Sequence, residues 1–257
     1  EDPVFETTTG PVRVITAASL FDGHDAAINV MRRLIQSSGA EVIHLGHDQS
    51  AKAVVDCAVQ EDAHAVALTS YQGGHVEYFT YIRQLLDEAG CEHVRIFGGG
   101  GGTITPPEIR TLHQSGISKI YSPDDGRTMG LMGMIHHLMG LASEVNLVGD
   151  ARLASIDGPV TPDDMAKVGL LMTLSESADD ATFKAAVDKA RSSDKEVPVI
   201  GFTGTGGAGK SSLLDELMLR IQRDNPGKKV CLLCVDPTRK RTGGALLGDR
   251  IRMNSLS

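Results

Sequence analysis

Residues 204–211 have the spacing of a phosphate-binding loop, with Gly204 and Gly209 followed by Lys210 and Ser211. The run satisfies G-x-x-x-x-G-K-[ST], in which glycines let successive backbone N–H groups point at a phosphate. Lys210 would neutralise phosphate charge, and the Ser211 hydroxyl would bind Mg²⁺. The alternative is a glycine-rich turn without a ligand, but an apolar run before the loop and an amphipathic run after it favour the nucleotide site. The residues expected at the nucleotide are Gly204, Gly206, Gly207, Ala208, Gly209, Lys210, Ser211 and Ser212.

Two acidic residues further along the chain, Asp236 and Asp249, are candidate partners of the same Mg²⁺ ion. Carboxylates that follow the second strand of such a fold suit Mg²⁺, directly or through water. The alternative is a pair of solvated loop acids, and position alone does not separate the two.

A second cluster, Asp22-Gly23-His24-Asp25, follows the first apolar run of the chain. A carboxylate two residues before a histidine can accept one ring N–H and orient the other ring nitrogen toward a metal. A histidine that only supports the fold is the alternative. The glycine run at 98–102 would allow a bulky ligand to approach the backbone closely, or else forms a flexible loop.

The elements that position these residues alternate along the first 142 residues. Strands are expected at 12–19, 41–45, 63–70, 93–97 and 117–121, and helices at 25–36, 49–61, 75–89, 106–115 and 127–142. The alternation predicts an α/β fold with a flavodoxin-like (Rossmann-type) five-stranded parallel sheet and helices on both faces. Ligands of such sheets bind at the carboxyl ends of the strands, which places the loops at 21–25, 70–75, 98–103 and 122–126 together.

The pattern changes after residue 145. Residues 146–196 are rich in Ser, Asp and Pro with two helical stretches, and a strand, a helix and a further strand are expected at 197–203, 211–223 and 229–235. The predicted domains are therefore a sheet domain at 1–145, a helical linker at 146–196, and the beginning of a P-loop NTPase α/β domain at 197–257.

The composition limits the classes of partner. The formal net charge is -8 and the pI is about 5.6, which argues against non-specific nucleic-acid binding because that needs a basic surface. The N-terminus does not have the basic and then apolar pattern of a secretory signal, and the longest apolar run, 129–141, is short and interrupted by two histidines. We expect a cytoplasmic protein without a membrane span.

Taken together, the motifs of the sheet domain resemble the D-x-H-x-x-G … S-x-L … G-G signature of cobalamin-binding domains. The resemblance implies that His24 binds cobalt in place of the cofactor's own base, with Asp22 as its hydrogen-bond partner. Two positions depart from the signature, since Ala27 replaces its last glycine and Gln72 its leucine, which weakens the expected contacts to the nucleotide tail. The expected cofactor-binding residues are His24, Asp22, Gly23, Ser70, Gln72, Gly98, Gly99 and Gly100.

The surrounding sequence is similar to the fused isobutyryl-CoA mutases, in which a cobalamin domain precedes a G-protein chaperone domain and a mutase barrel. This resemblance implies an adenosylcobalamin-dependent isomerase with GTPase activity, which uses GTP and Mg²⁺, forms a homodimer, and binds its acyl-CoA substrate through a domain outside this chain. The alternatives are a non-catalytic cobalamin carrier or sensor, or a G-protein chaperone for a separate mutase. A receiver domain fused to a P-loop kinase is disfavoured, because the third strand ends in Thr69 and Ser70 rather than in an acidic cluster.

Overall fold

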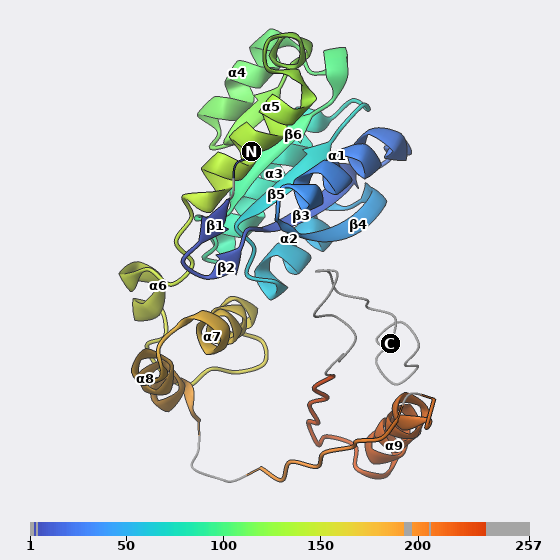
Figure 1. The fold of residues 1–257 in the computed structure, drawn as a ribbon, viewed down its shortest axis with the longest axis vertical. Coiled ribbons are helices and arrows are strands. Elements are labelled where there is room, and N and C mark those ends of the chain that lie inside the picture. The colour runs from blue at the N-terminus through green and yellow to red at the C-terminus, as the bar shows by residue number, and fades with distance from the viewer. Residues whose placement is uncertain (1–2, 4, 193–196, 206, 235–257) are drawn as a thin grey trace. The chain divides into compact units, whose positions relative to one another are not determined.

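The computed structural model describes residues 3, 5–192, 197–205 and 207–234, without the side chain of Glu6. The chain divides into two compact units, Glu1–Asp194 and Lys195–Ser257, and each is described by itself. The first unit contains the sheet and its helices, which Figure 1 shows as a ribbon.

Five parallel strands form the sheet of the first unit in the order β4-β3-β5-β6-β7. This order and the parallel pairing confirm the flavodoxin-like topology predicted from the sequence. The two central strands β3 and β5 are buried along nearly their whole length because helices cover both faces of the sheet. The strands are β3 (Arg13–Ser19), β4 (Glu41–Gln49), β5 (Ala65–Thr69), β6 (Arg95–Gly99) and β7 (Lys119–Tyr121).

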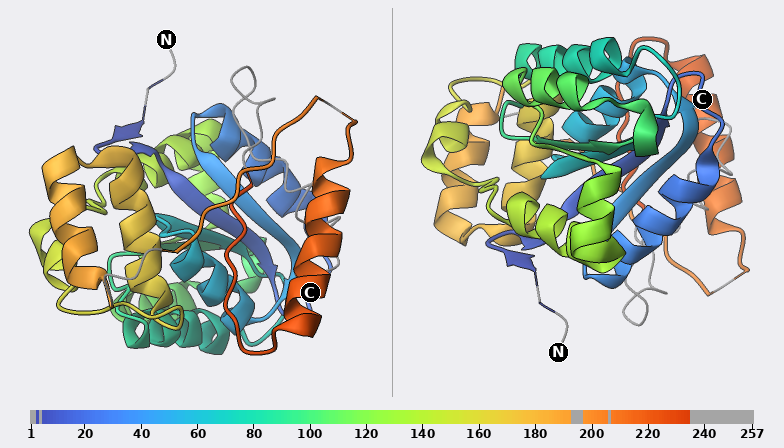
Figure 2. Two further views of the ribbon diagram at one scale, coloured as in Figure 1. Left: turned by 90° about the horizontal axis from the view of Figure 1, so that it is seen from below. Right: turned by 90° about the horizontal axis from the view of Figure 1, so that it is seen from above.

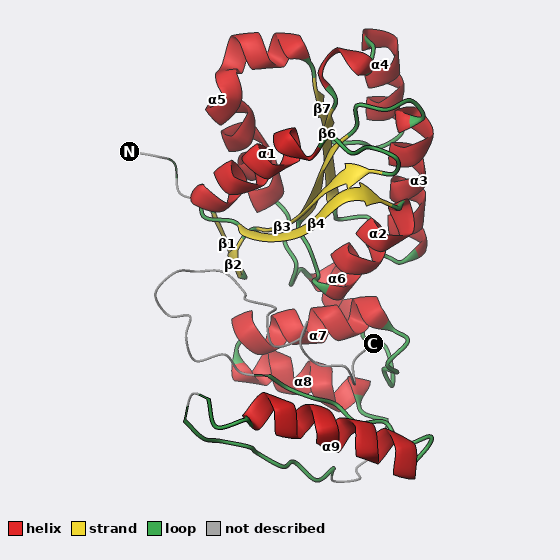
Figure 3. Cartoon of the chain, turned by 90° about the vertical axis from the view of Figure 1, so that its right-hand side faces the viewer, coloured by secondary structure: helices red, strands yellow, loops and turns green. Residues whose placement is uncertain are grey.

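Helices lie on both faces of the sheet, as Figure 3 shows. Ile15, Val66 and Leu68 pack under α2, α3 and α4, and Val14, Ala67 and Phe97 pack under α1 and α5. The helices are α1 (Asp25–Ser37), α2 (Ala51–Gln60), α3 (His75–Glu88), α4 (Pro106–Gln114) and α5 (Pro123–Ser143). Small additions are a hairpin of β1 (Glu6–Thr7) and β2 (Gly10–Pro11), and the 3₁₀ turn η1 (Gly101–Thr103).

Local capping signals fix where the helices start. The Ser50 hydroxyl accepts the N–H of Ala53 at the start of α2. Ser122 and Asp125 form a capping box at the start of α5, four residues before the predicted start at 127. The α5 helix is interrupted at Gly130, whose φ of 67° and ψ of 174° are not helical.

The edge strand β4 is longer than predicted because its pairing with β3 shifts register twice. Thr16 pairs with His44, Ala17 with Gly46 and Ser19 with Gln49, so residues of β4 bulge out between these pairs. The last residues of the two strands, Ser19 and Gln49, pair with each other, so the bulges take up the extra residues of β4.

The segment predicted as a helical linker packs against the sheet domain. It contains α6 (Asp150–Ala154), α7 (Met165–Ser177) and α8 (Asp180–Ala190), and the last two lie side by side in both views of Figure 2. Leu170, Leu174 and Ala186 form part of a small core of their own. A buried polar cluster joins α7 to the sheet domain. Thr173 Oγ1 donates to Asp62 Oδ2 at 2.6 Å and accepts from Arg13 Nη2 at 2.8 Å.

The second unit contains one regular element among its described residues, the helix α9 (Lys210–Asp224), close to the predicted helix at 211–223. The predicted strands at 197–203 and 229–235 are not formed in their described residues. An isolated strand is not stable without neighbours to pair with and a face to bury. Val197, Val199 and Ile200 are between 74% and 94% exposed here, so nothing covers the apolar run that predicted the strand.

Across the described residues, no helix is both long and apolar enough to cross a membrane.

Candidate functional site

Asp22 and His24 lie together in the loop that joins β3 to α1, at the carboxyl edge of the sheet. Nδ1 of His24 is 2.7 Å from Oδ1 of Asp22, which also accepts the His24 backbone N–H at 2.9 Å. The second carboxylate oxygen accepts the N–H of Tyr71 at 2.6 Å. Asp22 is fully buried, whereas the His24 side chain is 64% exposed. A carboxylate fixed against Nδ1 leaves Nε2 of an exposed ring available to a ligand or a metal.

Several donors keep the Asp22 carboxylate charged. Burial would raise the pKa of Asp22, but hydrogen bonds from the N–H of Tyr71 and from the backbone and ring of His24 hold it below its ordinary value. The Tyr71 ring flanks the imidazole, with ring centroids 5.5 Å apart. The imidazole is therefore held by a charged acceptor on one edge and lies beside an aromatic ring.

Thr69 and Ser70, at the end of β5, have opposite environments. Ser70 Oγ accepts a hydrogen bond from Ser19 Oγ at 3.0 Å, and both residues are buried. Thr69 is 7% exposed, and its Oγ1 is buried without a hydrogen-bond partner in the described part of the chain. Side chains alternate along a strand, so Thr69 faces α1 and α5 as Ala67 does, and Gly99 is its pairing partner in β6. Buried hydroxyls are nearly always satisfied, so this oxygen lacks a hydrogen bond that such a group ordinarily makes.

The cobalamin-binding signature predicts Ser70 as a cofactor-binding residue and does not include Thr69. The signal that separates them is the alternation of faces along β5, which follows from the buried pair Val66 and Ala67 on opposite sides of the sheet. An unsatisfied hydroxyl is visible only once the surrounding elements are in place.

The three glycines at the end of β6 have different surroundings. A Cβ at Gly98 would come within 2.4 Å of the Phe79 ring, so the packing of α3 requires this glycine. A Cβ at Gly100 would come within 1.9 Å of the Ser70 carbonyl oxygen, so the contact between two loops requires this one. A Cβ at Gly99 would meet its nearest atom, a backbone oxygen of β7, at 3.5 Å. Gly99 is therefore the glycine that the protein's own packing does not demand.

Gly23 and Gln72 border this site and are exposed. A Cβ at Gly23 would meet nothing within 4 Å, and the carbonyl oxygen of Gln72 lies 3.2 Å from Nδ1 of His75. The structure thus brings Asp22, His24 and the ends of β5 and β6 to one edge of the sheet, with Gly23 and Gln72 at its rim.

In the predicted phosphate-binding loop of the second unit, the lysine contacts two backbone carbonyl groups. The Lys210 ammonium donates to the carbonyl oxygens of Gly204 and Thr205, at 2.9 and 3.0 Å. Gly207 and Gly209 have φ angles of 76° and 81°, a conformation that favours glycine. Lys210 begins α9, which places Ser211, Ser212 and their N–H groups in its first turn. Ala208 donates its N–H to the Thr205 carbonyl oxygen at 3.3 Å. Gly206, Asp236 and Asp249 lie outside the described residues.

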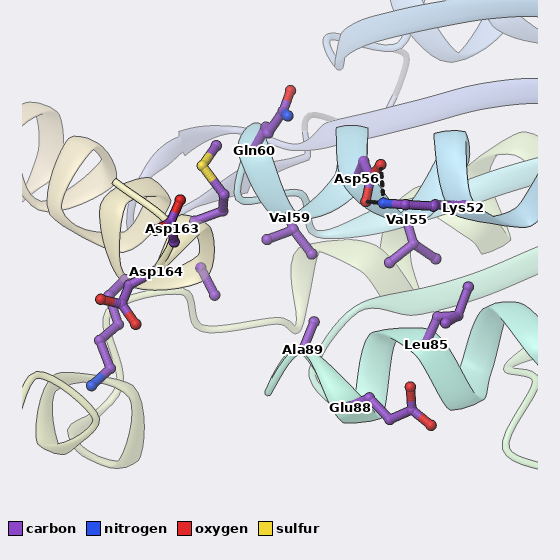
Figure 4. Close-up of a pocket in the computed structure, with 13 residues that line it drawn as sticks. Lys52, Val55, Asp56, Val59, Gln60, Leu85, Glu88, Ala89, Asp163 and Asp164 are labelled. Atoms are coloured by element: carbon purple, nitrogen blue, oxygen red, sulfur yellow. Dashed lines mark hydrogen bonds and ion pairs between the residues drawn. The ribbon is translucent and has the colours of Figure 1, made fainter. Parts of the chain in front are cut away.

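A pocket with a volume of about 520 Å³ lies elsewhere in the first unit, between α2, α3 and the start of α7. Figure 4 shows Lys52 and Asp56 of α2 paired on one side and Asp163 and Asp164 on the other. None of the motif residues lines it, and its charges are of both signs. The candidate site is thus an open edge of the sheet rather than this pocket.

Two protein families match the sequence. The B12 binding domain matches residues 12–122, and the family described as methylmalonyl Co-A mutase-associated GTPase MeaB matches residues 168–257. The second match begins inside α7, which is packed on the sheet domain. The B12 binding match thus precedes the GTPase match along the chain, and the second begins within the segment predicted as a linker.

Curated relatives match the chain across both families. Fused isobutyryl-CoA mutases from Geobacillus kaustophilus and Nocardia farcinica are 51% and 53% identical over 96% of this chain, which spans 23% of the length of each. The 2-hydroxyisobutanoyl-CoA mutase small subunit of Aquincola tertiaricarbonis is 33% identical over 44% of this chain and 82% of that subunit. Among solved structures, a cobalamin-binding protein from Desulfitobacterium hafniense matches with a TM-score of 0.42 and 18% identity, over 51% of this chain and 58% of that one. The chain belongs to the fused isobutyryl-CoA mutase family, with a B12 binding domain followed by a MeaB-type GTPase segment.

Proposed function

We propose that the first unit binds cobalamin with Nε2 of His24 as an axial ligand of cobalt. The observation that carries this proposal is the contact of 2.7 Å between Nδ1 of His24 and the buried, charged Asp22. A carboxylate behind a ligating imidazole fixes the ring and raises its basicity. His24 is a ligand in this proposal and does not act as an acid or base.

The residues around His24 fit the nucleotide tail of such a cofactor. Thr69 Oγ1 is a buried polar atom that lacks a partner in the described residues, and Gly99 leaves space beside it on the same face. We assign the contact with the tail to Thr69 and Gly99, with Gly23 and Gln72 at the rim. Ser70, Gly98 and Gly100 support the site through protein contacts of their own.

The second unit binds GTP and Mg²⁺ in our proposal. The loop from Gly204 to Gly209 would surround the phosphates, Lys210 would exchange its two carbonyl contacts for phosphate oxygens, and Ser211 would ligate Mg²⁺. Asp236 and Asp249 remain candidate partners of the ion. GTP rather than ATP is favoured by the match to a family of GTPases.

The whole protein, of which this chain spans a part, is proposed to be an adenosylcobalamin-dependent isomerase of acyl-CoA carbon skeletons. The names of these relatives favour isobutyryl-CoA as the substrate, and the proposed reaction interconverts isobutyryl-CoA and n-butyryl-CoA. The bound cofactor would supply the radical chemistry, and the protein would position and protect it. The acyl-CoA would bind through a domain outside this chain, and we expect a cytoplasmic homodimer.

The first experiment is a titration of this chain with adenosylcobalamin, followed by its visible spectrum, beside His24→Ala. Wild type is expected to give the spectrum of a cofactor whose own base is displaced and replaced by histidine, and the variant is expected to lose it. Binding by wild type and variant with the same spectrum would refute the assignment of His24.

A further inference from the structure

Asp48, near the end of β4, forms two hydrogen bonds with the loop that carries His24. The Asp48 carboxylate accepts the backbone N–H of Phe21 at 2.7 Å, and the Asp48 N–H donates to the carbonyl oxygen of Asp22 at 3.2 Å. Asp48 therefore contacts Phe21 and Asp22, the residues of the loop that come shortly before His24.

Both bonded residues have strained backbones. Among the described residues, three that are not glycine have φ in the left-handed region, and Phe21 at 62° and Asp48 at 56° are two of them. Asp tolerates this conformation, whereas a bulky residue such as Phe adopts it only under constraint. The Phe21 side chain is 79% exposed, so burial of its ring does not compensate for the strain. Two hydrogen bonds hold this conformation, the one from the Asp22 N–H to the Ser19 carbonyl oxygen at 3.0 Å and the one from the Phe21 N–H to Asp48.

Two bulges shape β4 near this contact. The register shifts against β3 place Gln49 opposite Ser19, the last residue of β3, so Asp48 lies one residue before the level at which both strands end. Bulges of this kind re-aim side chains at the edge of a sheet, next to functional sites. Without them, the offset of the first pairs, Arg13 with Glu41, would place His47 opposite Ser19 and move Asp48 out of its observed position.

We propose that Asp48 is a positioning residue for the cobalt ligand, which acts on His24 through Phe21 and Asp22 without touching the cofactor. This inference rests on the proposed role of His24. Loss of the Asp48 carboxylate would let the 21–24 loop fluctuate, so that less of the chain would present Nε2 in the binding conformation. The apparent affinity falls in proportion to that fraction.

Two variants separate positioning from plain support of the fold. Asp48→Gly removes the acceptor but relieves the left-handed strain, and Asp48→Asn keeps an acceptor oxygen and tolerates the same φ. For Asp48→Gly we expect faster backbone amide exchange at Phe21 and His24 without cofactor, measured by NMR. The adenosylcobalamin concentration that half-saturates the histidine-ligated spectrum is expected to rise about fivefold, as loss of one hydrogen bond would give. Asp48→Asn is expected to stay close to wild type in both measurements.

Unchanged half-saturation and unchanged amide exchange in Asp48→Gly would overturn the inference. It would also be overturned if the loss of affinity came with an equal loss in the free energy of unfolding of the cofactor-free chain, because Asp48 would then only support the fold. Absence of the histidine-ligated spectrum in wild type would instead refute the proposed function. The exchange rates of Phe21 and His24 would still report whether Asp48 holds the loop.

Discussion

At the scale of single residues, Thr69 and Ser70 are neighbouring hydroxyls for which opposite effects are expected. Thr69 Oγ1 is buried without a partner in the described chain, so Thr69→Val removes a desolvated oxygen and should leave the cofactor-free chain equally stable or about 1 kcal/mol more stable. The same variant should weaken cobalamin binding severalfold, because the proposed contact with the tail is lost. Urea unfolding of the cofactor-free chain and a spectral titration with cobalamin measure the two effects.

Ser70→Ala is the matched control for Thr69→Val. It leaves the buried hydroxyl of Ser19 without its acceptor, so it should destabilise the chain by about 1–3 kcal/mol. A gain in stability without any loss of cobalamin affinity in Thr69→Val would show that its hydroxyl has no ligand. A residue with a purely structural role would not give a variant that is more stable and yet binds cobalamin more weakly.

At the scale of elements, α7 approaches the end of α2 too closely for any side chain at Gly169. A Cβ there would lie 2.9 Å from the carbonyl oxygen of Val59 and 3.3 Å from the Asp62 side chain. Gly→Ala inside a helix ordinarily stabilises by about 1 kcal/mol. We expect Gly169→Ala to destabilise instead, because α7 must move away from α2 and strain the buried bond between Thr173 and Asp62. Urea unfolding measures this change.

The matched substitution is Gly140→Ala in α5, where the nearest atom to a new Cβ lies at 4.0 Å. It should stabilise by the ordinary amount. Equal effects of the two substitutions would mean that α7 does not pack tightly against α2. The helices after residue 146 would then be only loosely attached to the sheet domain.

Elements with strong local signals were predictable, and features that depend on partners were not. The alternation of apolar strands and amphipathic helices predicted the five strands and their helices, because both faces of a parallel sheet are buried. The Asp22–His24 contact followed from a spacing of two residues. The bulges of β4 and the unsatisfied Thr69 depend on neighbouring elements that no local pattern encodes. The strands expected at 197–203 and 229–235 fail in the described residues for the same reason, since strand propensity depends on the sheet around it.

At the scale of the first unit, the two edges of the sheet have different roles. The carboxyl edge carries the Asp22–His24 pair, and the amino edge carries the buried His64, the half-buried His93 and the polar cluster that joins α7 to the sheet domain. His64 Nδ1 accepts the N–H of Arg13 at 3.0 Å at the start of β3, and the His93 Nε2 is buried without a hydrogen-bond partner in the described residues. Burial, reinforced by Arg13 for His64 and by Arg152 for His93, lowers the pKa of each histidine to about 4.

These histidines should make the stability of the first unit depend on pH above the range in which most carboxylates titrate. Both are neutral in the folded state down to about pH 4 but take up protons below about pH 6.5 when unfolded, so stability is complete above that pH and is lost as the pH falls. Near pH 5 each contributes a slope of about 1.4 kcal/mol per pH unit, because the unfolded chain binds nearly one more proton per histidine. His93→Gln should remove about half of the slope that the pair contributes between pH 7 and 5, measured by urea unfolding across that range. If His93→Gln kept the wild-type slope, protonation of His93 would not contribute to acid unfolding, and the loss of stability would have to come from other groups of the unit.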